Sequence, residues 1–397
     1  MTYIINPNFV FTRKNDNSWI IFNCLKNTET EINSHTYNLL YNFFIPHDLE
    51  SLKKELSFKF GTSEDEIENI ISEFIKFELI IENSLKNSPS FQNLGGVFNS
   101  PLIRLDEAIK KKLYDVIFVG FAYEHGISNK GGTKFAPTHI RESSKSVYSQ
   151  KIIDNKLDIN KIYIGERLEE INIKIADLGD IKGDQIYFRN GKEFNFLTNI
   201  VKMIFNNNMF PTIMGGDHSI SYATIMGAAE SFSNVGVIQF DAHSDFSHRE
   251  YDSWENRMHH GNFMNWILAD KRISEVHQIG IRQITNSPAE DSKLFIWPDR
   301  SILFKKEEFL KLLSDDIPYF ITFDVDVLSP SIISSTGTPV PGGFNHYEII
   351  ELFEIISLNC NIVGCDFVEL FPGNNNEGII ISDIILKLLH FARKGKV

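Results

Sequence analysis

Aspartate and histidine side chains concentrate in three short segments of the sequence, which read GGDHS, DAHSD and FDVDVLSP. Alternate side chains of an extended strand project to the same side, so each segment can present several of them together. The side chains that can converge in this way are His218, Asp241, His243, Asp245, Asp324 and Asp326. A lone DxD is usually a turn former, and a lone histidine is usually a buried structural residue. Three such segments, each ending an apolar run, favour one shared functional site.

The chemistry of this set is that of a metal centre. Four carboxylates and two imidazoles cannot share a buried pocket without a cation, because burial and mutual repulsion would return protons to the carboxylates. Two divalent ions resolve the conflict. An oxygen-rich set with one histidine per metal suits manganese better than zinc, which prefers more nitrogen and sulfur ligands. We therefore expect two Mn²⁺ ions per subunit.

The elements that must position these ligands are short apolar runs, which alternate with helical stretches from residue 114 onward. The runs read YDVIFVGFA, IKIADLGD, FPTIMGGD, VGVIQFDAH, VHQIGIR, DIPYFITFDVD and IVGCDFVEL. Continuous Val/Ile/Phe runs of this kind indicate parallel strands covered on both faces, so we predict a three-layer α/β/α fold. Several runs end in acidic or histidine residues, and open α/β sheets bind ligands at the carboxyl ends of their strands.

The first 83 residues have a different pattern, which predicts a small α+β domain of three strands followed by helices. The expected strands are Phe9 to Arg13, Trp19 to Phe22 and Thr28 to Ile32. A capping signal at Thr62 and Ser63, with Glu66, begins the last helix. The apolar residues of that helix at helical spacing are Ile67, Ile70, Ile71, Phe74 and Phe77. Residues 84–113 are rich in Ser, Asn, Gly and Pro and are predicted to be a linker, which leaves 114–397 as the catalytic domain.

Composition excludes several classes of function. The formal charge of −13, from 52 acidic and 39 basic side chains, argues against broad attraction to nucleic acid or anionic lipid and favours a cationic substrate. The three cysteines form no CxxC, which suggests a reducing compartment. The N-terminus has no signal-peptide pattern, and no apolar run is long enough to span a bilayer. We therefore expect a soluble, cytoplasmic enzyme that binds neither nucleic acid nor a membrane.

The motifs resemble those of the ureohydrolase family, which includes arginases and agmatinases. The matching segments, in the family's order, are GGDHS, DAHSD, FDVDVLSPS, TGTPVPGG and DFVELFP, supported by VIFVGFAYEHG, KFAPTHIRE, IADLGDI and IGIR. The resemblance covers roughly residues 114 to 395. It implies that one manganese ion is held by His218, Asp241, Asp245 and Asp324. It implies that the other is held by Asp241, His243, Asp324 and Asp326, so that Asp241 and Asp324 bridge.

The resemblance further implies the removal of urea from a guanidino group. Two neighbouring metal ions lower the pKa of a shared water, and the resulting hydroxide would attack the guanidinium carbon. Asp245 is similar to the residue that relays the proton to the leaving nitrogen. His260, in MHHG, resembles the histidine that shuttles protons to solvent, although the adjacent His259 leaves the register of this match open. Glu369, in DFVELFP, matches the acid that binds the guanidinium, the alternative being a strand-end carboxylate.

The segments around the expected substrate pocket depart from those of enzymes that act on free arginine. Ser247 stands where those enzymes carry an Asn that reads the α-carboxylate, and GIRQITNSPAE lacks their Asp for the α-amino group. Ser247 and Asn256 are the further residues that we expect to contact the substrate. Recognition of a free α-amino acid is therefore not expected, whereas agmatine and other small guanidine compounds remain compatible with the sequence.

The N-terminal domain suggests a different substrate. Its segments NSWIIFN, TETEIN, SHTYNLLYNFF and FGTSEDEIENIISEFIKFELI resemble winged-helix domains that capture precursor peptides in ribosomal peptide maturation. This resemblance implies that a precursor peptide binds through its leader, which adds a strand to the domain's sheet. The enzyme would then convert peptidyl arginine to peptidyl ornithine and urea. The alternative is an agmatinase or guanidino-acid ureohydrolase that acts on a small free compound.

Three other interpretations compete with these. In the first, the N-terminal domain is a structural extension or an oligomerisation element. The resemblance to the ureohydrolase family also makes a homo-oligomer the expected assembly. A DNA-binding regulator is disfavoured because residues 1–83 carry 7 Lys and Arg against 13 Asp and Glu. A peptide-binding pseudoenzyme is disfavoured because the ligand set is complete.

Overall fold

The structure is a computed structural model in which the chain forms two compact units. One unit lies within residues 1–93 and the other within 94–397. The residues described are 2–6, 9–15, 17–23, 28–44, 47–82, 95–124, 126–127, 131–181, 192–246, 258–284, 289–314, 316–373 and 375–394. Val97 and Phe98, in the range predicted as a linker, are fully buried in the core of the second unit.

The first unit contains the predicted order of strands and helices. Strands β2 (Phe9–Asn15), β3 (Ser18–Asn23) and β4 (Thr28–Asn33) form an antiparallel sheet in that order. The helices that follow are α1 (Ser34–Leu40), α2 (Leu49–Phe60) and α3 (Glu64–Lys76). A second sheet, which the sequence does not predict, joins β1 (Thr2–Ile5) to β5 (His47–Asp48) and β6 (Ile80–Glu82).

Helix α3 shows how the local sequence builds this unit. The Ser63 side chain caps the helix by accepting a hydrogen bond from the backbone N–H of Glu66. Three acidic residues in the first turn stabilise the helix by interacting with the positive end of its dipole. Ile67, Ile71 and Phe74 are buried in the small core, as expected. Phe77 is not: the helix ends at Lys76, so Phe77 leaves the helical face and its side chain is 61% exposed.

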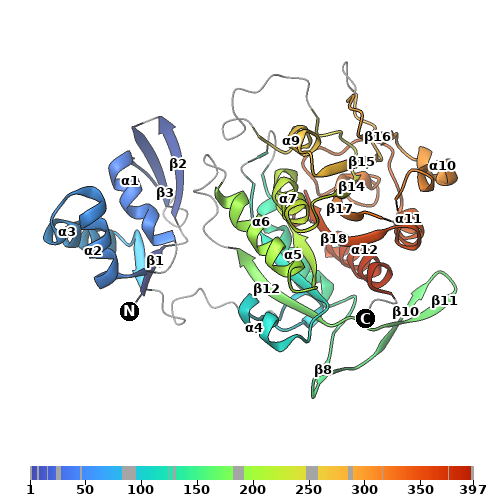
Figure 1. Cartoon of the computed structure of the whole chain (residues 1–397), viewed down its shortest axis with the longest axis horizontal. Helices are drawn as coiled ribbons and strands as arrows, with labels where there is room; N and C mark the ends of the chain where they lie inside the picture. The colour runs from blue at the N-terminus through green and yellow to red at the C-terminus, as the bar shows by residue number, and fades with distance from the viewer. Residues whose placement is uncertain are drawn as a thin grey trace. The chain divides into compact units, whose positions relative to one another are not determined.

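The second unit is built on one parallel sheet of eight strands, in the order β12-β7-β13-β18-β17-β14-β15-β16. Strands β18, β17, β14, β15 and β16 of this sheet are labelled in Figure 1. Seven of them match the predicted runs and confirm the fold class. Their bounds are β7 (Val116–Phe121), β12 (Ile175–Ile181), β13 (Phe210–Met214), β14 (Val235–Phe240), β15 (Ile273–Ile279), β17 (Pro318–Asp324) and β18 (Asn361–Val368). The eighth, β16 (Leu294–Trp297), is not predicted from the sequence.

Helices cover both faces of this sheet and make the three layers. One hydrophobic core includes residues of α5 (Ala136–Ser144), α11 (His346–Asn359) and α12 (Asn375–Arg393). The other includes residues of α4 (Leu105–Lys111), α6 (Lys192–Phe205), α7 (Ser221–Phe232) and α9 (Met264–Ala269). Every residue of β7 and β14 is buried, which explains their continuous apolar sequences.

Smaller elements complete the second unit. Hairpins β8–β9 (Ile152–Ile153, Lys156–Leu157) and β10–β11 (Asn160–Ile164, Arg167–Ile171) connect α5 to β12, and α10 (Lys306–Leu310) follows β16. Among the described residues no helix combines the length and the apolar character needed to cross a membrane.

Candidate metal centre and active site

The predicted ligands lie where three strands of the sheet end. His218 follows β13, the DAHSD segment follows β14, and Asp324 is the last residue of β17. Strand β17 pairs with β14 on one side and with β18 on the other, and β18 pairs with β13. The carboxyl ends of these neighbouring parallel strands therefore bring the three segments together at one edge.

The first cluster of ligands surrounds the ring of His218. Its Nδ1 atom lies 3.0 Å from Oδ2 of Asp241, 2.9 Å from Oδ2 of Asp245 and 3.3 Å from Oδ2 of Asp324. All four side chains are buried. One imidazole nitrogen carries at most one hydrogen, and this Nδ1 makes no hydrogen bond of normal geometry with the described residues. A lone pair facing three carboxylates is the arrangement that a bound cation satisfies.

A second cluster shares Asp241 with the first. His243 Nδ1 lies 2.9 Å from Oδ2 of Asp326 and 3.6 Å from Oδ1 of Asp241. The ligand atoms of His218, Asp241 and Asp245 lie within 4.8 Å of one another, as do those of Asp241, His243 and Asp326. Asp241 thus presents one carboxylate oxygen to each cluster. The donor set fits two hard divalent cations that share a bridging carboxylate.

Electrostatics support the same conclusion. Burial, together with the charge of Asp241, raises the pKa of Asp245 to about 7, and burial also raises the pKa of Asp324. Burial lowers the pKa of the His243 imidazole, but hydrogen bonds to Asp241 and Asp326 outweigh it and raise that pKa to about 12. Without a cation, protons held by the carboxylates and by the imidazoles must therefore balance the buried charge.

Buried polar residues behind the ligands fix their orientation. Thr322 Oγ1 lies 2.8 Å from Nε2 of His218, so that the opposite nitrogen, Nδ1, faces the cluster. Gln239 Nε2 donates to Oδ2 of Asp241 at 2.7 Å, and Gln278 Nε2 donates to Oε1 of Gln239 at 2.7 Å. Sequence reasoning does not identify these three residues. The available signal is their polar character within otherwise apolar strands.

His260 and Glu369 lie in contact beside the first cluster. Glu369 Oε1 lies 3.0 Å from Nδ1 of His260 and accepts a 2.9 Å hydrogen bond from the backbone N–H of His218. Burial lowers the pKa of His260, but the Glu369 carboxylate outweighs burial and raises that pKa to about 9. His259 is exposed, whereas His260 lines the cavity, so the structure distinguishes the two neighbouring histidines.

A cavity of about 150 Å³ opens over the ligands. Its lining residues are His218, His243, Ser244, Asp245, Phe246, His260, Gly261, Gln283, Asp324 and Thr338. Glu369 is not among them and lies next to His260. Ser247 and Asn256, which the sequence analysis predicts to contact the substrate, lie outside the described residues.

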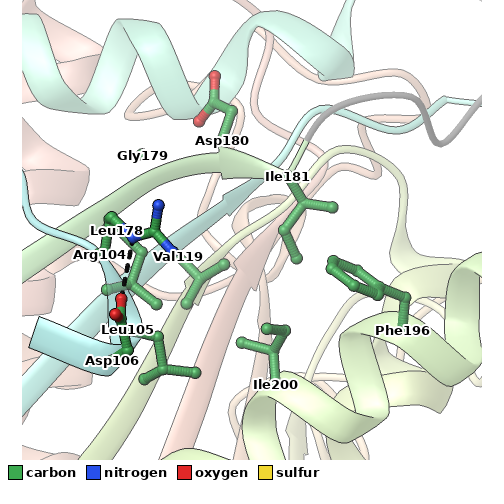
Figure 2. A pocket seen from close by; sticks show the side chains of 10 residues that line it. All are labelled: Arg104, Leu105, Asp106, Val119, Leu178, Gly179, Asp180, Ile181, Phe196 and Ile200. Carbon is green, nitrogen blue, oxygen red and sulfur yellow. Dashed lines mark hydrogen bonds and ion pairs between the residues drawn. The ribbon is translucent and has the colours of Figure 1, made fainter. Parts of the chain in front are cut away.

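A larger cavity, of about 450 Å³, lies between α4, the edge strand β12 and α6 (Figure 2). Its side chains are mainly apolar, with Ile181, Phe196 and Ile200 on one side and Leu105 and Leu178 on the other. Its described lining residues include neither histidine nor cysteine. The smaller cavity, which contains the ligand clusters, is therefore the candidate active site.

Comparisons with known proteins agree with this geometry. The model of the Arginase family matches residues 114–390. The mitochondrial agmatinase of Gallus gallus is 25% identical over 304 residues, which cover 72% of this chain and 84% of the relative. A hypothetical agmatinase from Burkholderia thailandensis superposes with a TM-score of 0.62 at 20% identity, over 76% of this chain and 90% of its own. Trypanosoma cruzi formiminoglutamase with Mn²⁺ gives 0.58 at 18% identity, over 71% and 94%.

Proposed function

This chain belongs to the arginase family and hydrolyses guanidino carbon–nitrogen bonds, and we propose that it does so with two Mn²⁺ ions, releasing urea. The observation that carries the proposal is the pair of buried His/Asp clusters that share Asp241. One ion would be held by His218, Asp241, Asp245 and Asp324, and the other by Asp241, His243, Asp324 and Asp326. When bound, the two ions would lower the pKa of a water molecule enough to make hydroxide available at neutral pH.

The chain's own residues provide the proton transfers. The oxygen of water adds to the guanidinium carbon, the bond to the amine nitrogen breaks, and a proton must reach that nitrogen as it leaves. Asp245 lines the cavity beside His218, so it is placed to relay this proton to the leaving nitrogen. His260 also lines the cavity and exchanges protons with solvent, while Glu369 stabilises its imidazolium form.

The comparisons favour a small free guanidine compound as the substrate. The relatives reported above include proteins named agmatinase, and agmatine carries a guanidinium on a short alkyl chain. A cationic substrate also agrees with the chain's formal charge of −13.

A second candidate substrate, peptidyl arginine, is supported by the N-terminal unit. This unit lies outside the family match at residues 114–390 and has its own core. Its β2-β3-β4 sheet has edge strands β2 and β4, and a precursor's leader peptide could pair with such an edge. Tethering the precursor in this way would raise its effective concentration at the catalytic cavity.

One experiment tests the proposed reaction and separates the two substrates. The full-length, manganese-loaded protein is incubated with agmatine and with an arginine-containing precursor peptide encoded near its gene, and urea and peptide mass are measured. Asp324→Asn is the matched inactive control, because it removes the negative charge of a ligand that both ions would share. Excess leader peptide without arginine should inhibit processing of the precursor but not of agmatine. Urea from neither substrate, with manganese bound, would contradict the proposed reaction.

A further inference from the structure

We infer that Gln283 and Ser244 select a guanidine compound whose tail carries a neutral peptide group rather than an ammonium or a carboxylate. This inference rests on the proposed guanidino hydrolysis and concerns the part of the substrate that lies away from the reacting carbon. Of the two candidate substrates, it supports peptidyl arginine over agmatine, whose tail ends in an ammonium group. Both residues line the cavity over the ligand clusters.

The backbone places Gln283 next to the metal-binding segment. The backbone N–H groups of Arg282 and Gln283 donate to the carbonyl oxygen of Ala242 at 2.9 and 3.1 Å. Ser244 lies between the candidate ligands His243 and Asp245, and its own carbonyl accepts a 2.5 Å hydrogen bond from Gln278 Nε2. The wall formed by Gln283 and Ser244 is therefore fixed to the elements that hold the ligands.

The two side chains make a weak reciprocal pair. Gln283 Oε1 accepts from the backbone N–H of Ser244 at 3.3 Å, and Gln283 Nε2 donates to Ser244 Oγ at 3.3 Å. These distances are at the long end of the normal range. A carboxamide has two N–H donors and two acceptor lone pairs, so this pair leaves one donor and one acceptor of Gln283 for a ligand.

A peptide group presents the complementary combination, one N–H and one carbonyl oxygen. An ionic tail would fit the same wall poorly. Apart from the candidate metal ligands and His260, the described residues that line the cavity are uncharged, and they include Phe246 and Thr338. Moving an ammonium or carboxylate from water to an uncharged wall is unfavourable without an opposite charge. A site built for hydrogen bonds also discriminates against a substrate that lacks the matching groups.

The test compares three guanidines that differ only in their tails: Nα-acetyl-L-arginine N-methylamide, agmatine and n-butylguanidine. Urea release is measured with the full-length, manganese-loaded protein. The wild type should have its highest kcat/KM on the acetylated amide. In Gln283→Ala, the ratio of kcat/KM for the amide to that for butylguanidine should fall by about tenfold, mainly through KM, as expected for one or two neutral hydrogen bonds.

Two further variants complete the test. Gln283→Glu keeps the shape of the side chain but adds a negative charge, which attracts the ammonium group of agmatine. The preference of this variant should therefore shift from the amide toward agmatine. Ile284→Ala changes the fully exposed neighbouring side chain and should leave the ratio unchanged. Two results would overturn this inference: a kcat/KM ratio of amide to butylguanidine in Gln283→Ala that stays within about twofold of wild type, or a wild type that prefers agmatine. In either case, urea released from butylguanidine would still support the proposed reaction. Absence of urea from all three guanidines would overturn both.

Discussion

Thr322→Val removes one hydroxyl and keeps the size of a fully buried side chain behind the metal centre. In the wild type, Thr322 Oγ1 lies 2.8 Å from Nε2 of His218 and donates to Ser221 Oγ at 3.0 Å. The hydroxyl therefore accepts the Nε2 hydrogen and leaves the Nδ1 lone pair facing three carboxylates. In the variant, a buried Nε2–H without an acceptor costs about 1 to 3 kcal/mol.

The metal-free variant can avoid this cost by keeping a proton on Nδ1 alone, where carboxylate oxygens lie 2.9 to 3.3 Å away. That tautomer cannot coordinate a cation through Nδ1. We therefore expect little loss of stability without metal but a loss of Mn²⁺ affinity of about 10- to 100-fold, typical of an outer-shell partner. At a Mn²⁺ concentration 100 times the wild-type Kd, metal-linked stabilisation should fall from about 2.7 kcal/mol to between about 1.4 and 0.4 kcal/mol.

Isothermal titration calorimetry gives the Mn²⁺ affinity, and urea unfolding with and without EDTA gives the metal-linked stabilisation. Thr212→Val is the matched control, because Thr212 is also a fully buried strand threonine but is contacted at 3.8 Å by Cys365 Sγ instead of by a candidate ligand. This control should bind Mn²⁺ as the wild type does. If Thr322→Val binds Mn²⁺ within about twofold of wild type, the proposed orientation of His218 is wrong.

Three other perturbations test separate parts of the structure. Chelation should abolish urea release and added Mn²⁺ should restore it; activity in protein shown by mass spectrometry to be metal-free would refute the binuclear site. Glu369→Gln should lower the pKa of His260 from about 9 toward its ordinary value, as measured by NMR of the imidazole. Because that pKa is raised on folding, the wild-type pair stabilises the protein fully below about pH 6.5 and loses this contribution as pH rises through about 9, whereas the variant should lack this pH dependence. Asp177→Asn breaks a buried ion pair with Arg141, whose nitrogens lie 2.8 and 3.0 Å from the carboxylate, and should lower the free energy of unfolding in urea by about 3 to 5 kcal/mol. Asp106→Asn, in an exposed pair with Arg104, should cost far less, and equal costs would contradict the burial argument.

The sequence predicts the fold of the second unit well because its strands are buried on both faces. Such strands read as continuous apolar runs that are separated by chain long enough for helices. Strand β16 is the exception, since three of its four residues are only partly buried and its apolar sequence is very short. In the first unit, the helix cap at Ser63 can be predicted because it depends only on neighbouring residues. The exposure of Phe77 could not be predicted, because it depends on where the helix ends.

The candidate ligands are also predictable, because their alternation at strand ends is a local property of the sequence. The residues that orient them are not. Thr322 reaches His218, 104 positions away, and this contact depends on the order and register of strands, which no local pattern specifies. The contact between His260 and Glu369 likewise joins a loop to a strand end 109 positions away.

The position of β18 in the sheet determines when the active site can form during synthesis. This strand, at residues 361–368, lies between β13 and β17, so it joins the half that carries His218 to the half that carries Asp324. Until it is made, β12-β7-β13 and β17-β14-β15-β16 have no strand between them. The ligands from β13 therefore cannot be fixed beside those from β14 and β17 until nearly the whole chain has left the ribosome. Metal binding should thus be a late event, and a nascent chain that ends before residue 361 should bind manganese poorly even though it already contains every predicted ligand.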